Sequence, residues 1–255
     1  MPEGLEAAIY ASAATELVEH QITSIEVDER CGDINALTSL VGDRICGVKR
    51  HGKRVALVTE CAEVELYFAM TGRLIVNGVA PIAALEYGPA NELREWDRLV
   101  IETDRGSLRV NDPRRWARFA LDPDWSNLGI DFMSPAQALG DALRAQRHRR
   151  CSIKTLLLDQ HVIAGLGNML VDESLFQAGI DPRRPCASLS SLDVDGLAEH
   201  ISAVVTELES RGGSHTGTLN PDLRRALAGC PLDGAPLQRM NISGRTTIFC
   251  SHHQR

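Results

Sequence analysis

The sequence contains no apolar run of the roughly 18–20 residues that a membrane-spanning helix needs, which argues against an integral membrane protein. Residues 1–14 show no basic segment followed by an apolar stretch, so we expect no secretory signal. The seven cysteines are scattered and odd in number, which favours a reducing compartment over a disulfide framework. Repeats and low-complexity tracts are absent as well. These absences predict a globular, cytoplasmic protein that has no membrane partner.

The charge is distributed unevenly. A net charge of −7 at first argues against a nucleic-acid partner. Three windows, however, hold 13 of the 27 basic residues and no acidic one: 44–54, 114–118 and 144–154. A basic surface on an acidic body could bind a polyanion, whereas each window taken alone is more simply a solvated face.

The 255 residues suffice for two domains or one large one, and their pattern changes near residue 130. Short β-rich runs separated by turn residues predict antiparallel strands over 55–59, 62–68, 72–77, 98–103 and 107–110. Helical spacing predicts helices over 6–19, 134–147, 153–158, 168–178 and 191–210, with Ser134 and Ser191 as N-caps and Gly179 as a stop. Residues 228–255 have the Gly, Pro and Cys spacing of a small hairpin. We therefore expect three domains: 1–124, 134–227 and 228–255.

The first candidate site is the N-terminus, Met1-Pro2-Glu3. A small second residue normally lets the initiator methionine be removed, which would leave Pro2 with a free secondary amine. An α-amino group has a pKa of about 7.7–8, so part of it is neutral and nucleophilic at physiological pH. Its attack on a sugar C1′ would give an iminium ion, with Glu3 as general acid–base. The alternative is a frayed N-terminus of no significance.

The glycine-rich turn before Asn168 is a second candidate, because Gly165 and Gly167 allow close backbone approach or positive φ. Backbone N–H groups at the start of the helix could then hold a phosphate, although an ordinary helical hairpin with an asparagine cap explains the same spacing.

Three further segments combine basic and apolar side chains: Gly52-Lys53, the turn at Met70, and Arg114-Arg115-Trp116. Exposed apolar wedges beside arginines suit a protein that unstacks a base and fills the gap. The alternative places Met70 and Trp116 in the core.

Near the C-terminus, Cys230 and Asp233 have the same spacing as Cys250 and His253, about 20 residues further on. All four are admissible zinc ligands, although two thiolates are a weaker signal than four. The alternative is a finger without zinc, held by packing of Leu232, Ile248 and Phe249 on the helical domain.

Together these segments resemble the formamidopyrimidine-DNA glycosylase / endonuclease VIII family of base-excision repair enzymes. The resemblance covers nearly the whole chain and is most specific over 156–185, which is similar to the family's helix–two-turn–helix element. MPEG (1–4), HGK (51–53), MTGRL (70–74), DPRRW (112–116) and GRTTIFCSHHQR (244–255) follow in family order. The resemblance implies an α+β fold: an N-terminal antiparallel β-sandwich, a helix–two-turn–helix domain and a zinc-finger-like hairpin.

The resemblance also implies a role for each matching residue. Pro2 would be the Schiff-base nucleophile and Glu3 its proton shuttle, with Glu6 holding the N-terminal helix. The phosphate contacts would come from Lys53, Asn168 and Arg245, and the space left by the extruded base would be filled by Met70, Arg114 and Trp116. A structural zinc ion would be held by Cys230, Asp233, Cys250 and His253. Asp233 and His253 stand at positions where the family usually has cysteine.

The implied function is a bifunctional DNA glycosylase and abasic-site lyase in the cytoplasm and nucleoid of a bacterium. The implied protein is a monomer whose partner is damaged double-stranded DNA, with single-stranded and abasic DNA as further candidate partners. The segment 212–229 is short where relatives that recognise oxidised purines carry a longer loop, which argues against 8-oxoguanine as the substrate. The alternative function is a lesion-binding paralogue with weak or no catalysis.

Overall fold

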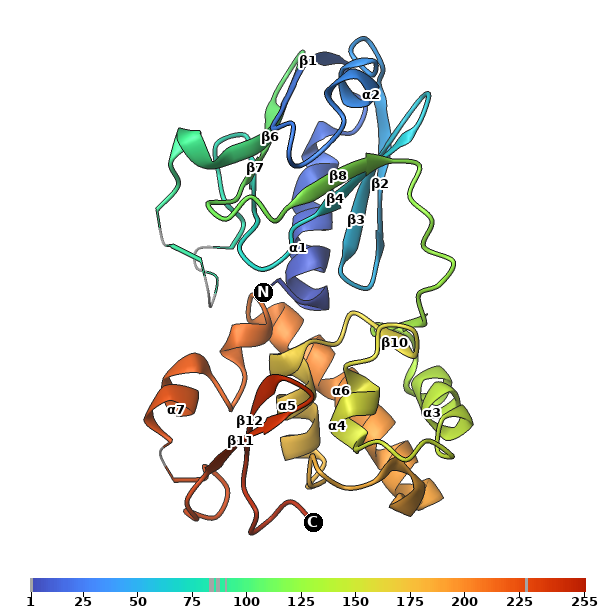
Figure 1. Ribbon diagram of the computed structural model, residues 1–255, viewed down its shortest axis with the longest axis vertical. Helices are drawn as coiled ribbons and strands as arrows, with labels where there is room; N and C mark the ends of the chain where they lie inside the picture. The colour runs from blue at the N-terminus through green and yellow to red at the C-terminus, as the bar shows by residue number, and fades with distance from the viewer. Residues whose placement is uncertain (1, 83–84, 86–87, 90, 228) are drawn as a thin grey trace. The chain divides into compact units, whose positions relative to one another are not determined.

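The computed structural model describes residues 2–82, 85, 88–89, 91–227 and 229–255. The chain divides into two compact units, Met1–Ser126 and Asn127–Arg255 (Figure 1). No helix of the described residues is both long and apolar enough to cross a membrane.

The first unit contains two four-stranded antiparallel sheets. One sheet has the order β1 (Ile22–Val27), β6 (Asp97–Thr103), β7 (Ser107–Asn111), β5 (Arg73–Val76), and the other has the order β2 (Ile45–His51), β3 (Arg54–Thr59), β4 (Glu63–Tyr67), β8 (Arg118–Leu121). The helical segments of this unit are α1 (Gly4–Ala14), η1 (Thr15–Leu17), α2 (Ile34–Thr38) and η2 (Arg94–Trp96). All five predicted strands are present. Strands β1, β2 and β8 were not anticipated, and β2 lies inside the basic window 44–54.

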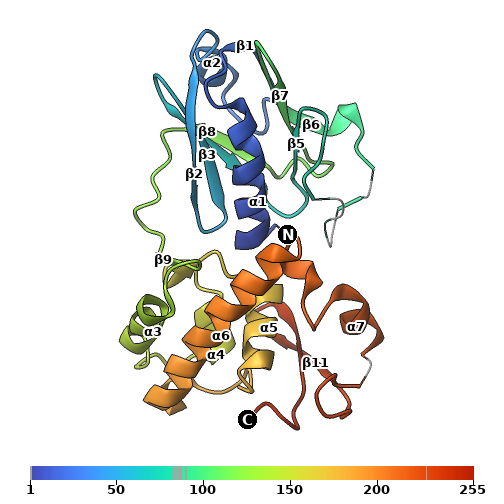
Figure 2. The same ribbon diagram turned by 180° about the vertical axis from the view of Figure 1, so that it is seen from behind.

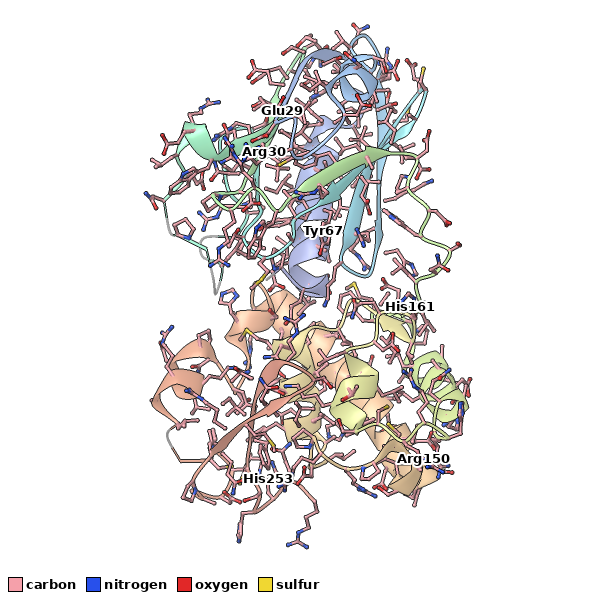
Figure 3. The ribbon with its side chains drawn as sticks, viewed as in Figure 1. Glu29, Arg30, Tyr67, Arg150, His161 and His253 are labelled. Carbon is pink, nitrogen blue, oxygen red and sulfur yellow. The ribbon has the colours of Figure 1, made fainter. Side chains whose placement is uncertain are left out.

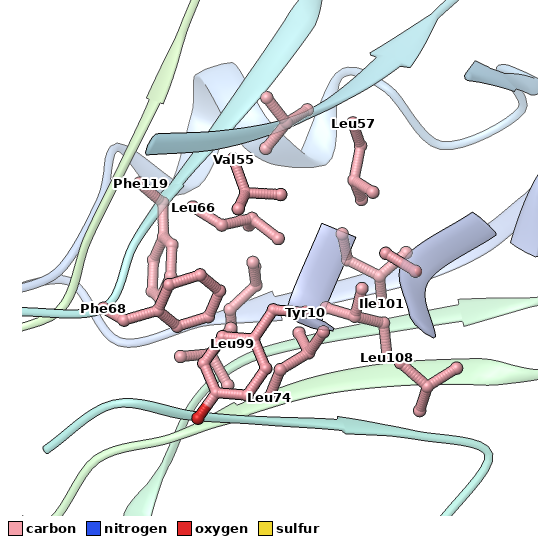
Figure 4. Close-up of a cluster of buried hydrophobic side chains, with 14 of the residues drawn as sticks. Tyr10, Val55, Leu57, Leu66, Phe68, Leu74, Leu99, Ile101, Leu108 and Phe119 are labelled. Atoms are coloured by element: carbon pink, nitrogen blue, oxygen red, sulfur yellow. The ribbon is translucent and has the colours of Figure 1, made fainter. Parts of the chain in front are cut away.

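One core joins the two sheets to α1, as Figure 4 shows. Leu57 and Leu66 of one sheet and Leu99 and Leu108 of the other are all fully or almost fully buried in it. The ring of Tyr10 from α1 packs there at 4.7 Å from the ring of Phe68. Apolar side chains from both sheets therefore face a shared interior, which confirms the predicted β-sandwich.

The second unit is mainly helical. Its helices are α3 (Ala136–Ala145), α4 (Ile153–Leu157), α5 (Asn168–Gln177), α6 (Ser191–Ser210) and α7 (Pro221–Ala226), with the short segments η3 (Cys186–Ser188) and η4 (Ser214–Thr216). The long helix α6, seen most clearly in Figure 2, packs against α3 and α5. A short parallel pair, β9 (Ile130–Asp131) with β10 (Ile163–Ala164), precedes α5, and the antiparallel hairpin of β11 (Gln238–Ile242) and β12 (Arg245–Phe249) ends the unit.

The structure corrects both predicted N-caps. Helix α6 is capped by Ser190, not Ser191, because the side chain of Ser190 accepts from the N–H of Asp193, whose carboxylate in turn accepts from the N–H of Ser190. The N-cap of α3 is Pro135, not Ser134, and it makes no side-chain cap.

Gly179 ends α5 as predicted. Its φ of +67° is a left-handed conformation, and the next N–H, of Ile180, donates back to the carbonyl of Leu175. Such a stop turns the chain sharply away from the helix axis.

Candidate functional site

The N-terminus is tied directly to the start of α1. Glu3 is the N-cap of this helix, and its N–H donates to Oε2 of Glu6 at 2.7 Å. Both glutamates are 3 % exposed. Glu6 therefore fixes the backbone immediately after Pro2, so that Pro2 directly precedes a capped helix rather than lying in a frayed tail.

Lys53 lies in the two-residue turn that joins β2 to β3. The turn is closed by the pair His51 and Arg54, and Gly52 within it has a φ of +57°. The guanidinium of Arg50 donates to the carbonyl of Gly52 at 3.1 Å. The hairpin therefore holds Lys53 at its tip, on a rigid support.

Met70 lies in the tight turn between β4 and β5. The N–H of Gly72 donates to the carbonyl of Phe68 at 2.9 Å, and Ala69 takes a φ of +50°. A Cβ on Gly72 would approach that carbonyl oxygen to 2.4 Å, so only glycine fits there. The turn leaves Met70 half-buried at its apex.

Arg114 and Trp116 lie in the loop between β7 and β8. Trp116 is 46 % exposed, so it is not a core residue. The guanidinium of Arg114 lies 5.1 Å from the centre of the Trp116 ring, within cation–π range. The loop thus presents a basic and an aromatic group side by side.

In the second unit, Asn168 is the first residue of α5, as predicted, and follows the N-cap Gly167. The earlier turn residue Gly165 has a φ of +112°, and a Cβ there would meet the ring of Phe132 at 2.1 Å. The Nδ2 of Asn168 donates to the carbonyl of Thr246 at 2.9 Å.

Asn168 and Arg245 are therefore brought close together, because Thr246 is the neighbour of Arg245 in β12. Arg245 is exposed directly after the turn of the hairpin, where Ser243 and Gly244 both have positive φ. The buried Oδ1 of Asn168 has no hydrogen-bond partner among the described residues. The helix start and the hairpin thus form one polar surface element.

A buried ion cluster lies beneath this element, and the sequence analysis missed it. Lys154 and Asp172 are both wholly buried, with 2.6 Å between Nζ and Oδ1, and Arg224 contacts Oδ2 of Asp172 at 2.9 Å. Oδ2 also accepts from the N–H of Ile248 at 3.2 Å. Lys154 and Arg224 each reach the carbonyl of Thr246 at 3.4 Å. The cluster connects α4, α5 and α7 to the hairpin.

The basic window 144–154 is consequently not a free cationic face. Its Lys154 is in the interior, Arg149 contacts Asp159 at 2.8 Å, and Arg144 contacts Asp141 at 2.6 Å. The expectation that this window faces a polyanion is wrong for Lys154, because a buried lysine needs an internal counter-charge rather than an external one.

The four predicted metal ligands do come together. One ligand atom from each of Cys230, Asp233, Cys250 and His253 lies within 4.8 Å of the others. The Sγ of Cys230 is 3.5 Å from Nδ1 of His253, and the Sγ of Cys250 is 3.7 Å from both carboxylate oxygens of Asp233. Ligands about 2.0–2.3 Å from a tetrahedral zinc ion lie about 3.3–3.8 Å apart, so the Cys230–His253 and Cys250–Asp233 separations are compatible with zinc.

The surroundings of His253 also suit a metal ligand. Figure 3 labels His253 in the second unit. Its Nε2 is 3.1 Å from the carbonyl of Phe176, and its ring meets that of Phe176 edge-on, with 4.5 Å between the ring centres. A hydrogen bond from Nε2–H to this carbonyl leaves Nδ1 as the unprotonated ligand atom, facing Cys230. Burial raises the pKa of Cys230 in the absence of a metal. A cation at this position would favour its thiolate.

The packing alternative for the hairpin holds only in part. Ile248 and Phe249 are buried as it required, whereas Leu232 is 61 % exposed. Ile248, Cys230 and Cys250 share a small core with Phe176 of α5. The packed core and the candidate metal site therefore share Cys230 and Cys250.

Comparison with known proteins agrees with this geometry. Residues 1–119 match the formamidopyrimidine-DNA glycosylase N-terminal domain, and residues 128–219 match the formamidopyrimidine-DNA glycosylase H2TH domain. The formamidopyrimidine-DNA glycosylase of Paracoccus denitrificans (strain Pd 1222) is 32 % identical over 234 residues, which cover 83 % of each chain. The chain belongs to this family.

Solved structures show the same fold over the whole length. The MutM (Fpg) protein of Thermus thermophilus has a TM-score of 0.81 at 26 % identity, covering 99 % of this chain and 98 % of its own. The Lactococcus lactis Fpg in complex with abasic-site DNA has a TM-score of 0.80 at 23 % identity, covering 99 % of both chains. The predicted family and the predicted α+β fold are both confirmed.

Proposed function

We propose that this protein is a DNA glycosylase and abasic-site lyase that removes damaged bases through the amine of Pro2. The observation that carries the proposal is the Pro2-Glu3 pair held at the capped start of α1 in a member of the formamidopyrimidine-DNA glycosylase family. The relatives are named as glycosylases, and one solved neighbour holds abasic-site DNA. Because the relatives are bacterial, we place the activity on the DNA of a bacterial cytoplasm.

The chemistry requires that Met1 be removed, since only then is the secondary amine of Pro2 free. The amine attacks C1′ of the damaged nucleotide while Glu3 protonates the opening sugar. The C1′–base bond breaks, the base leaves with its electron pair, and an iminium ion remains. This ion acidifies C2′, so that loss of a C2′ proton expels the 3′ phosphate and cuts the strand.

Binding would depend on groups from both units. Lys53 in the first unit and Asn168 and Arg245 in the second are proposed to contact phosphates. Met70, Arg114 and Trp116 are proposed to fill the gap left when the base leaves the stack, a step that costs a few kcal/mol.

We further propose that zinc stabilises the hairpin that carries Arg245. Cys230 and Cys250 would supply thiolates, His253 its Nδ1, and Asp233 a carboxylate oxygen. The ion would act structurally, because all four ligands come from the protein and leave no open position for a substrate.

Borohydride trapping tests the proposal, because an imine with DNA can be reduced to a stable amine. Protein without Met1, verified by intact mass, should become covalently attached to abasic-site DNA. Pro2→Gly should weaken trapping while DNA affinity is retained, and Pro123→Gly, in a loop of the same unit, should trap like the wild type. Absence of a trapped species with the wild type would instead favour a lesion-binding paralogue.

A further inference from the structure

The carboxylate of Asp112 lies at the centre of the loop that carries Arg114 and Trp116. Asp112 is 0 % exposed. Its Oδ2 accepts from the N–H groups of Trp116 at 2.7 Å and Ala117 at 2.8 Å, and its Oδ1 accepts from the N–H of Arg114 at 3.1 Å. A buried carboxylate bonded to three backbone donors fixes the path of that backbone.

The same carboxylate also holds the Met70 turn. Thr71 directly follows Met70, is 2 % exposed, and donates its hydroxyl to Oδ1 of Asp112. That oxygen also accepts from the N–H of Arg114. One carboxyl group therefore joins two loops whose contact residues are 41 positions apart in the chain.

Asp112 is itself rigidly supported. Its N–H donates to the carbonyl of Trp96 and its carbonyl accepts from Nε of Arg98, both at 2.8 Å. Arg98 and Arg115 each contact Oδ2 of Asp28 at 3.1 Å. The backbone of Asp112 is therefore bonded to Trp96 and to Arg98 of β6, and Arg115, three residues later, is held through Asp28, which directly follows β1.

We propose that Asp112 and Thr71 are positioning residues that make the Met70 turn and the Arg114–Trp116 loop enter DNA as a single wedge. The inference rests on the proposed function. Three side chains can fill one gap together only if the distance between their loops is already set, since otherwise part of the binding energy is lost in ordering them. Thr71 thus acts on base extrusion without touching the DNA.

The test variant is Thr71→Val, which removes the hydroxyl and keeps the shape. Thr71→Ser restores the hydroxyl, and Thr103→Val is the matched control, because Thr103 donates its hydroxyl to the carbonyl of Gly106 in a distant turn of the same unit. Two assays are carried out on each variant. The first assay uses a duplex that contains the oxidised base that the wild type removes fastest, with 2-aminopurine as its neighbour. It gives the single-turnover rate of excision, and the fluorescence of 2-aminopurine gives the rate of base extrusion. The other is borohydride trapping on a single-stranded abasic oligonucleotide, which needs no extrusion.

We expect Thr71→Val to slow extrusion and excision in the duplex about tenfold and to leave single-stranded trapping within twofold of the wild type. Thr71→Ser and Thr103→Val should behave as the wild type in both assays. The effects of Met70→Ala and Trp116→Ala on extrusion should be non-additive in the wild type and additive in the Thr71→Val background.

Duplex rates of Thr71→Val within twofold of the wild type would overturn the inference. An equal slowing on single-stranded abasic DNA would overturn it too, because the hydroxyl would then merely support the fold. Failure of the wild type to trap abasic DNA would instead refute the proposed function, so the two failures are distinct.

Discussion

Replacing Asp172 by asparagine should strongly destabilise the second unit. Asp172 contacts both Lys154 and Arg224, and its side chain is wholly buried. Asparagine has nearly the same shape, but it removes the negative charge. Its N–H₂ group would also face the groups that donate to Asp172, which are the side chains of Lys154 and Arg224 and the N–H of Ile248. Lys154 and Arg224 would then lie together in the interior without this counter-charge.

The expected loss is about 3–5 kcal/mol, the usual cost of removing one partner from a buried ion pair. Small domains have total stabilities of about 5–15 kcal/mol, so the change is a large fraction of the whole. With a urea m-value of about 2 kcal/mol/M, the unfolding midpoint should fall by about 2 M.

The assay can separate the two units. All three tryptophans, Trp96, Trp116 and Trp125, lie in the first unit, so their fluorescence follows that unit, whereas ellipticity at 222 nm follows mainly the helices of the second. The matched control is Glu207→Gln, since Glu207 and Arg211 form an ion pair with both side chains 52 % exposed. The control should change stability by less than about 0.5 kcal/mol. A midpoint for Asp172→Asn no lower than that of the control would refute the reasoning.

Other expected outcomes follow from the same structure. Lys53→Ala and Arg245→Ala should each flatten the slope of log K against log salt by about one unit, and unchanged slopes would show no phosphate contact. Protein purified without chelator should contain one zinc per chain, lost in Cys250→Ser; sub-stoichiometric metal and no effect of EDTA on stability would contradict the zinc site. Burial alone would raise the pKa of Asp159, but hydrogen bonds from Arg149 and a backbone N–H lower it below its usual value. Its depressed folded pKa adds stability at neutral pH that is lost as the pH falls through that pKa, so the urea midpoints of Asp159→Asn and the wild type should begin to converge below about pH 4.

The sequence predicts a helix or strand correctly where the spacing of its apolar residues and the residues at its ends indicate the same element. The 191–210 helix was predicted with its final bounds, because apolar spacing and a polar cap agree there. Its cap was misplaced by one residue, since two adjacent serines offer the same hydroxyl and only Ser190 has the extended backbone that a cap needs. Strand β2 was missed because the adjacent Lys49 and Arg50 marked this window as a charged surface and interrupt the apolar pattern of a strand.

Contacts between residues far apart in the chain could not be predicted from these local patterns. Nothing in the local pattern distinguishes the buried Lys154 from its exposed basic neighbours, because its partner Asp172 lies on another helix. Thr71 and Asp112 likewise belong to separate motifs, and only the sandwich brings them together. The grouping of Cys230, Asp233, Cys250 and His253 was predictable because the two pairs have the same spacing in the sequence, whereas the contact of His253 with Phe176 depends on how the hairpin packs.

The hairpin shares its core with α5, which has a consequence for how this part of the protein opens. Phe176 is a helix residue, yet the side chains around it include Cys230, Ile248 and Cys250 of the hairpin segment. Hydrogen-exchange protection should therefore be lost from the hairpin and from the end of α5 in one cooperative event, rather than from the hairpin first. A chain truncated before residue 229 would expose Phe176 to water, so the hairpin cannot be removed as an independent module.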